Sequence, residues 1–201
     1  MGLVSVANLK EYLPEIQGNG ADAELSNLIE RGESVIARFL GFPLNDAGSI
    51  ALTDSTYTLY IDSPQEFDHF VLQLPIKPII SVTSVYSDLD REYESDSEIH
   101  SDEYTIDAQK AQIILKLNVA TIGFNTGYRA NRVICRAGFD SSYTDLIHAI
   151  CVYCSHIYRA KASQGKKSTT IRNASTTFSP NTIPEEVKQV LFQYRSSYMI
   201  M

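Results

Sequence analysis

The sequence predicts an α+β fold in which a small helical bundle forms the core and an antiparallel β subdomain is inserted into it. Apolar residues recur at helical spacing near both ends of the chain, whereas the middle consists of short runs rich in Val, Ile, Thr and Tyr. The length of 201 residues, with 44% hydrophobic and 20% charged residues, suits one ordinary domain with an insertion. We therefore predict a single domain over 1–201, with a helical core over 5–50 and 140–201 and a β-rich insertion over 52–138.

The N-terminal part of the helical core is predicted to hold two helices. The first, over 5–13, is short, with Ser5 as its N-cap and Pro14 as its stop. The second covers 25–40, where apolar residues recur at spacings of three, four and seven, and Gly41 ends it.

The central part is predicted to form strands because β-branched and aromatic residues dominate runs that Pro, Asp, Ser and Gly separate. Two of the runs, 104–106 and 113–117, are close enough to form a hairpin. The remaining predicted strands lie at 57–61, 70–74, 79–86 and 132–137.

The C-terminal part of the helical core begins with a long helix over 143–158, for which Thr144 is the predicted N-cap. A Ser- and Thr-rich segment over 165–182 has no apolar period, so we expect a mobile loop there. Pro184 then opens a final helix.

Charge is segregated along the chain. The net charge of −7 and the pI near 5.1 argue against attraction of the whole chain to nucleic acid or to an anionic membrane. An acidic stretch over 88–103 supplies candidates for a partner surface, namely Asp88, Asp90, Glu92, Glu94, Asp96 and Glu98. A basic stretch over 159–172 supplies candidates for contact with a partner or with DNA phosphates in a channel, namely Lys161, Lys166, Lys167 and Arg172.

Two interpretations of these stretches stay open. Patches of opposite sign suit head-to-tail association of identical subunits, because each subunit offers its acidic surface to a neighbour's basic one. Runs of like charge are also typical of solvated loops.

The sequence offers little for catalysis or metal binding. His148, Cys151, Cys154 and His156 are clustered, but they sit within one predicted helix, and zinc sites usually combine ligands from separate segments. The acidic stretch alternates as a calcium loop does, yet it has no Gly at the turn and no closing Glu at the required spacing. We therefore predict no enzyme, no catalytic, metal or cofactor-binding residue and no cofactor, and we expect the thiols to be free.

Three groups of segments, in this order, resemble the head-to-tail connector or adaptor family of tailed bacteriophages. The first group is LKEYL (9–13), ELSNLI (24–29) and IARFLG (36–41). The second is LPIKPIISVTSVY (74–86), YTID (104–107) and IIL (113–115). The third is RAGF (136–139), DLIHAI (145–150), IYRA (157–160) and IPEEV (183–187).

The resemblance implies a structural subunit of a phage or prophage virion, made in the bacterial cytoplasm. Members of the family form a ring, typically dodecameric, under the portal protein, where the ring extends the DNA channel and docks tail or stopper proteins. The implied partners are further copies of the chain, the portal protein and a stopper or tail-completion protein. DNA would pass without sequence recognition, no membrane is involved, and an isolated subunit can be monomeric. The alternatives are another virion completion or stopper protein, or a non-catalytic domain that binds a small ligand or a metal.

Overall fold

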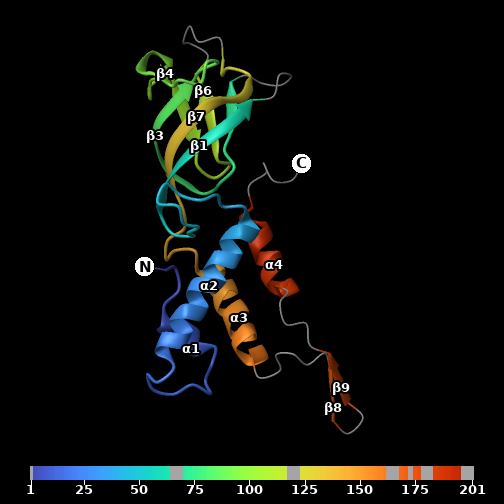
Figure 1. Cartoon of the computed structure of the whole chain (residues 1–201). Coiled ribbons are helices and arrows are strands. Elements are labelled where there is room, and N and C mark those ends of the chain that lie inside the picture. The colour runs from blue at the N-terminus through green and yellow to red at the C-terminus, as the bar shows by residue number, and fades with distance from the viewer. Residues whose placement is uncertain are drawn as a thin grey trace. The chain divides into compact units, whose positions relative to one another are not determined.

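The structure is a computed structural model that describes residues 2–63, 70–116, 123–161, 168–171, 174–177 and 183–195. The chain divides into two compact units (Figure 1). The helical unit comprises Met1–Ile36 and Ser141–Gln193, and the β unit comprises Ala37–Asp140 and Tyr194–Met201. Within the described residues, no helix is both long enough and apolar enough to span a membrane.

The helices occur where the sequence predicts them. They are α1 (Val6–Glu11), α2 (Asp22–Leu40), α3 (Thr144–Ala160) and α4 (Glu185–Phe192). The predicted cap of α1 is confirmed, since the Ser5 hydroxyl accepts a hydrogen bond from the Asn8 backbone N–H at 3.2 Å. The predicted cap of α3 is wrong: Tyr143 occupies the N-cap position without a side-chain hydrogen bond, and Thr144 is already helical.

The core of the helical unit consists of the apolar stripes of its helices. The buried residues include Leu9, Leu25, Ile29, Leu146, Ile150, Cys154, Val187 and Leu191. Helices α2 and α3 approach closely at Gly32, where an added Cβ would lie only 2.6 Å from the Cys154 sulfur. The Cys154 thiol also points toward the Leu28 carbonyl oxygen, at 3.8 Å.

The β unit contains two antiparallel sheets. The larger has the order β1 (Ser55–Ser63), β7 (Gly127–Ala137), β3 (Ile79–Ser87) and β4 (Glu98–Ile99). The smaller has the order β2 (Val71–Gln73), β6 (Gln112–Leu115) and β5 (Tyr104–Asp107). Alternate side chains on these strands are buried, including Tyr57, Leu59, Ile61, Leu72, Ile113, Leu115, Val133 and Cys135. The β unit therefore has an apolar core of its own.

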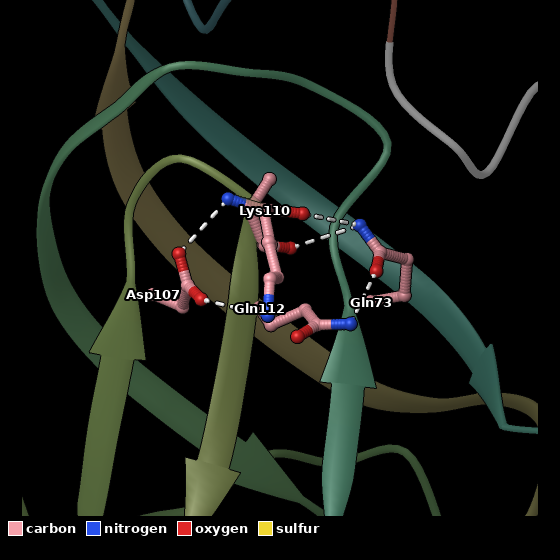
Figure 2. A network of polar contacts seen from close by, with 5 residues as sticks. Gln73, Asp107, Lys110 and Gln112 are labelled. Atoms are coloured by element: carbon pink, nitrogen blue, oxygen red, sulfur yellow. Dashed lines mark hydrogen bonds and ion pairs between the residues drawn. The ribbon is translucent and has the colours of Figure 1, made fainter.

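Polar contacts brace the turn of the predicted hairpin, which is confirmed as β5 and β6 (Figure 2). The Gln73 amide on β2 donates to the Lys110 carbonyl at 2.8 Å and to the Ala111 carbonyl at 3.2 Å. The Gln73 side-chain oxygen accepts from the Gln112 side-chain amide at 3.0 Å, and the Asp107 carboxylate accepts from the Lys110 backbone N–H at 3.0 Å. The Gln73 side chain thus supplies a donor to the Lys110 carbonyl and a second donor to the Ala111 carbonyl, which also accepts from the Leu74 N–H at 2.8 Å.

The segment after β7 crosses the backbone near residue 53. Gly138 has φ +139°, and an added Cβ there would lie 2.5 Å from the Thr53 carbonyl carbon. Phe139 follows, its N–H donating to the Leu52 carbonyl at 2.8 Å and its ring packing against Phe42 and Tyr194. Only glycine fits this crossing, which gives a physical reason for the Gly-Phe pair.

The predicted fold class, a small helical bundle core with an inserted antiparallel β subdomain, is wrong. The described residues form four helices and, in the β unit, seven antiparallel strands in two sheets. Both sheets carry buried apolar residues, among them Val133 and Ile113, and all seven strands lie within the β unit, so the strands supply an apolar core of their own. The prediction of domain boundaries stays a prediction.

In the segment over 165–182, where a mobile loop is expected, the described residues form β8 (Ser168–Ile171) and β9 (Ala174–Thr177), which pair antiparallel. The rest of that segment lies outside the described residues. The two strands show no apolar period because backbone pairing between Thr-rich strands needs no apolar stripe.

Candidate interaction surfaces

The acidic stretch begins with a turn that folds around one carboxylate. The Asp88 side chain accepts hydrogen bonds from three backbone N–H groups, those of Asp90 at 2.9 Å, Glu92 at 3.0 Å and Tyr93 at 2.8 Å. These hydrogen bonds, the one from Tyr93 foremost, lower the pKa of the Asp88 carboxyl. Both carboxylate oxygens are thus engaged in holding the turn.

The other acidic candidates follow along the loop between β3 and β4. Glu94 precedes a short 3-10 helix over Ser95–Ser97 that contains Asp96, and Glu98 lies on β4 opposite Tyr86. The solvent-exposed members are Asp90, Glu92, Glu94, Asp96 and Glu98. This part of the chain is therefore an exposed acidic edge of the β unit.

The described part of the basic stretch is paired within the helical unit. Lys161, the C-cap of α3, forms an exposed ion pair with Glu24 that raises the pKa of the lysine. The Arg159 guanidinium donates hydrogen bonds to the Glu15 carboxylate at 3.1 Å and to the Tyr12 carbonyl at 2.8 Å. The candidates Lys166, Lys167 and Arg172 lie outside the described residues.

The outer face of the larger sheet carries a cluster that the sequence did not reveal. We call it the tyrosine–arginine surface, formed by Tyr60, Tyr86, Tyr93, Tyr128, Arg129 and Arg132. The strand register places Arg132 of β7 between Tyr60 of β1 and Tyr86 of β3. Tyr60, Tyr86 and Arg132 lie on three strands that are far apart along the chain, so only knowledge of the register could have brought them together.

The two guanidinium groups of this surface lie against tyrosine rings. The Arg132 guanidinium is 4.1 Å from the centroid of Tyr86 and 4.7 Å from that of Tyr93, and it donates to the Tyr93 carbonyl at 3.2 Å. The Arg129 guanidinium is 5.1 Å from the centroid of Tyr60 and 5.6 Å from that of Tyr128. These distances lie within the range of cation–π attraction.

Of the clustered histidine and cysteine residues, the two cysteines are buried in the packing of α3, whereas His148 and His156 are exposed. The Tyr12 hydroxyl and the His148 Nδ1 are 2.7 Å apart, which ties the end of α1 to α3. Cys151 and Cys154 are free and buried, and burial raises the pKa of each thiol to about 12. In the described ranges, no group of three or more His, Cys, Asp or Glu residues could hold a metal ion.

A family model supplies the identification. The model of the head completion proteins matches residues 2–197. The chain belongs to the head completion protein family. This membership confirms the family resemblance inferred from the sequence, and with it a structural head-to-tail adaptor role in a phage-like virion.

Solved structures are similar in fold to this head completion protein. One, described as the neck of a native gene transfer agent particle computed with C12 symmetry, has a TM-score of 0.54 and 16% sequence identity and covers 95% of this chain and 87% of its own. Another, described as the virion of a native gene transfer agent particle, has a TM-score of 0.52 and 14% identity and covers 90% of this chain and 80% of its own. A search of curated proteins gave no significant match.

Proposed function

We propose that this head completion protein works as one adaptor domain over its whole length, forming a ring in the virion neck. The observation that carries the proposal is the family match, which extends over residues 2–197 and so covers both compact units. By resemblance the ring has twelve subunits, and the symmetry of the similar neck structure, C12, supports that number. The ring would extend the DNA channel under the portal and dock a stopper or tail-completion protein, without catalysis by its own residues.

A closed ring requires two different surfaces on each subunit that fit each other. The exposed acidic edge of the β unit, from Asp90 to Glu98, is a proposed contact for a positively charged neighbour. Lys166, Lys167 and Arg172, which lie beside Lys161 along the chain, are proposed to contact a partner's acidic surface or DNA phosphates. Even a few charges per subunit, repeated around a ring, would create a strong local field.

The experiment is to determine the molar mass of the purified protein by light scattering at low and moderate salt, alone and with the portal protein from the same phage. A ring, or assembly that depends on the portal and weakens with salt, is the expected result. A mass that stays at one subunit under all four conditions would contradict the proposal. Bound zinc or calcium in that monomeric protein would instead favour a ligand-binding domain.

A matched pair of variants tests the role of the basic residues. Exchange of Lys166 and Lys167 for Gln removes two positive charges, whereas exchange of both for Arg keeps them. Weaker assembly of the Gln variant together with normal assembly of the Arg variant is expected, and equal assembly of both would exclude a role for these charges.

A further inference from the structure

Strand β1 is the longest strand at an edge of the two sheets of the β unit. It has nine residues, whereas the other edge strands, β2, β4 and β5, have three, two and four. One side of β1 pairs with β7, and among the described residues no strand pairs with its other side. An unpaired edge of this length presents a row of backbone groups with which another strand can pair.

Asp46 covers the first part of this outer side as a strand would. Its backbone N–H donates to the Thr56 carbonyl at 3.0 Å, and its carboxylate accepts from the Thr58 backbone N–H at 2.8 Å and from the Thr58 hydroxyl at 3.1 Å. The backbone groups of Thr56 and Thr58 therefore point away from β7. Because this direction alternates along an antiparallel strand, the N–H and C=O of Tyr60 also point away from β7.

Beyond Asp46 the outer side of β1 is open. The Thr58 carbonyl and the N–H and carbonyl of Tyr60 have no hydrogen-bond partner among the described residues, and Tyr60 is 45% exposed. The run over 58–61, which we call the open edge, contains no Lys or Pro of the kind that proteins place on edge strands to prevent pairing. Three free backbone groups suit a partner strand of three or four residues.

The hairpin of β8 and β9 supplies strands of that length. Each strand has four residues, and within the described part of the chain the two strands pair only with each other. An isolated two-stranded hairpin is at best marginally stable in water, so this one would gain stability by joining a larger sheet. Both strands consist mainly of Ser and Thr and contain no Pro, and threonine favours strands.

We propose that the open edge of β1 receives the β8–β9 hairpin of a neighbouring copy of this chain by strand addition. This inference rests on the proposed ring. Main-chain hydrogen bonds would supply the affinity, and the four-stranded sheet of one copy would continue into the two-stranded sheet of the next. The charges favour the pairing, because the sequence over 168–177 contains Arg172 and no acidic residue, whereas the open edge lies between Asp46 and Asp62.

The proposed contact is heterologous. The open edge belongs to the β unit and the hairpin to the helical unit, so each copy offers one of each. Heterologous contacts are the kind that build rings, whereas pairing of β1 with its own equivalent would stop at a dimer. The inference therefore names two complementary surfaces that a ring requires.

The first test is sedimentation velocity of the full chain over a range of concentrations, with the portal protein added if the chain alone stays monomeric. Tyr60→Pro removes the outward N–H, and proline is tolerated at an edge position whose N–H faces away from the ladder. Tyr60→Ala is the matched control, because it loses the same ring and keeps the N–H. We expect Tyr60→Pro to weaken self-association about tenfold or more and Tyr60→Ala less than about threefold. Equal weakening would assign the effect to the ring and overturn the inference.

The second test is complementation between two variants. Replacement of residues 168–177 by a Gly-Ser linker of equal length removes the hairpin and keeps the open edge, whereas Tyr60→Pro keeps the hairpin and blocks the edge. Each variant alone should stay monomeric. Their mixture should form a heterodimer that grows no further, because only one edge and one hairpin can pair.

The outcomes separate this inference from the proposed ring. A mixture that stays monomeric, or a hairpin-less variant that assembles normally, would overturn the inference while the ring of the wild-type chain stands. The hairpin-less variant decides the question by itself if Tyr60→Pro fails to fold, as judged by circular dichroism. Dimers of the hairpin-less variant alone would assign β1 to pairing with its own equivalent and overturn the inference. A wild-type chain that never assembles, with or without the portal protein, would overturn both.

Discussion

The close approach of α2 and α3 predicts that Gly32→Ala either destabilises or stabilises the protein, depending on whether the Cys154 sulfur is present. An alanine Cβ at position 32 would lie 2.6 Å from the Cys154 sulfur, and the next nearest atom, Cδ1 of Tyr153, is at an ordinary 3.7 Å. Gly32→Ala should therefore destabilise the protein, and the same substitution should become stabilising once Cys154→Ala has removed the sulfur.

The expected change in the free energy of unfolding results from two opposed effects. Replacing glycine by alanine inside a helix stabilises it by about 1 kcal/mol. Forcing an extra methyl group into a packed contact costs about 1–3 kcal/mol, and the buried Cys154 has little room to turn away. We expect a net loss of about 1 kcal/mol in the wild-type background and a gain of about 1 kcal/mol in the Cys154→Ala background.

The assay is urea unfolding of the four proteins, followed by far-ultraviolet circular dichroism because the chain has no tryptophan. The coupling free energy of the cycle should be about 2 kcal/mol. An equal effect of Gly32→Ala in both backgrounds would refute the reasoning, since it would mean that the helices are not in contact at this point.

Three further predictions concern Gly138, the buried thiols and Glu33. Gly138→Ala should cost about 3 kcal/mol or more in urea unfolding, whereas Gly48→Ala, also at positive φ but with nothing within 4 Å, should cost only about 1–2 kcal/mol; equal losses would exclude the clash with residue 53. With pKa values raised to about 12, the three buried thiols should hold roughly one thiolate in ten thousand at pH 8, so iodoacetamide should label them only after unfolding, and rapid labelling of the folded protein would contradict their burial. Burial raises the pKa of the Glu33 carboxyl above 4.5, so the folded state holds that proton more tightly than the unfolded state and the stability that Glu33 contributes falls as the pH rises through the window from 4.5 to the raised pKa. Glu33→Gln should remove this fall from the pH profile of unfolding, and an unchanged profile would rule it out.

The helices could be predicted from the sequence because their signals are local. Ser5 as a cap, the apolar spacing of α2 and Pro184 before α4 all act within a few residues of the backbone that they control. Strand positions were likewise predictable, although β7 begins at Gly127, before the predicted start of that strand at 132. The sequence does not reveal that the strands form a core of their own, because this depends on the order in which the strands pair. Hydrophobic periodicity carries no information on that order.

The candidate surfaces, like the fold, could be predicted from the sequence only in part. The acidic stretch was visible because charge is a property of each residue, but the engagement of the Asp88 carboxylate by backbone amides was not. The tyrosine–arginine surface was invisible because Tyr60, Tyr86 and Arg132 become neighbours only through the β1, β7 and β3 register. Tyrosines scattered over three strands give no local signal.

The position of β7 constrains the order in which the chain can fold during synthesis. This strand, Gly127–Ala137, pairs with both β1 and β3, so the larger sheet lacks its middle until more than half of the chain has left the ribosome. The helical unit closes later still, because its first part ends at Ile36 and its second begins at Ser141. Contacts of such sequence separation fold slowly and leave unpaired edges exposed while they form. The nascent chain of this protein therefore has a long interval of vulnerability to aggregation, and substitutions that shorten it should raise the yield of soluble subunits without changing the finished structure.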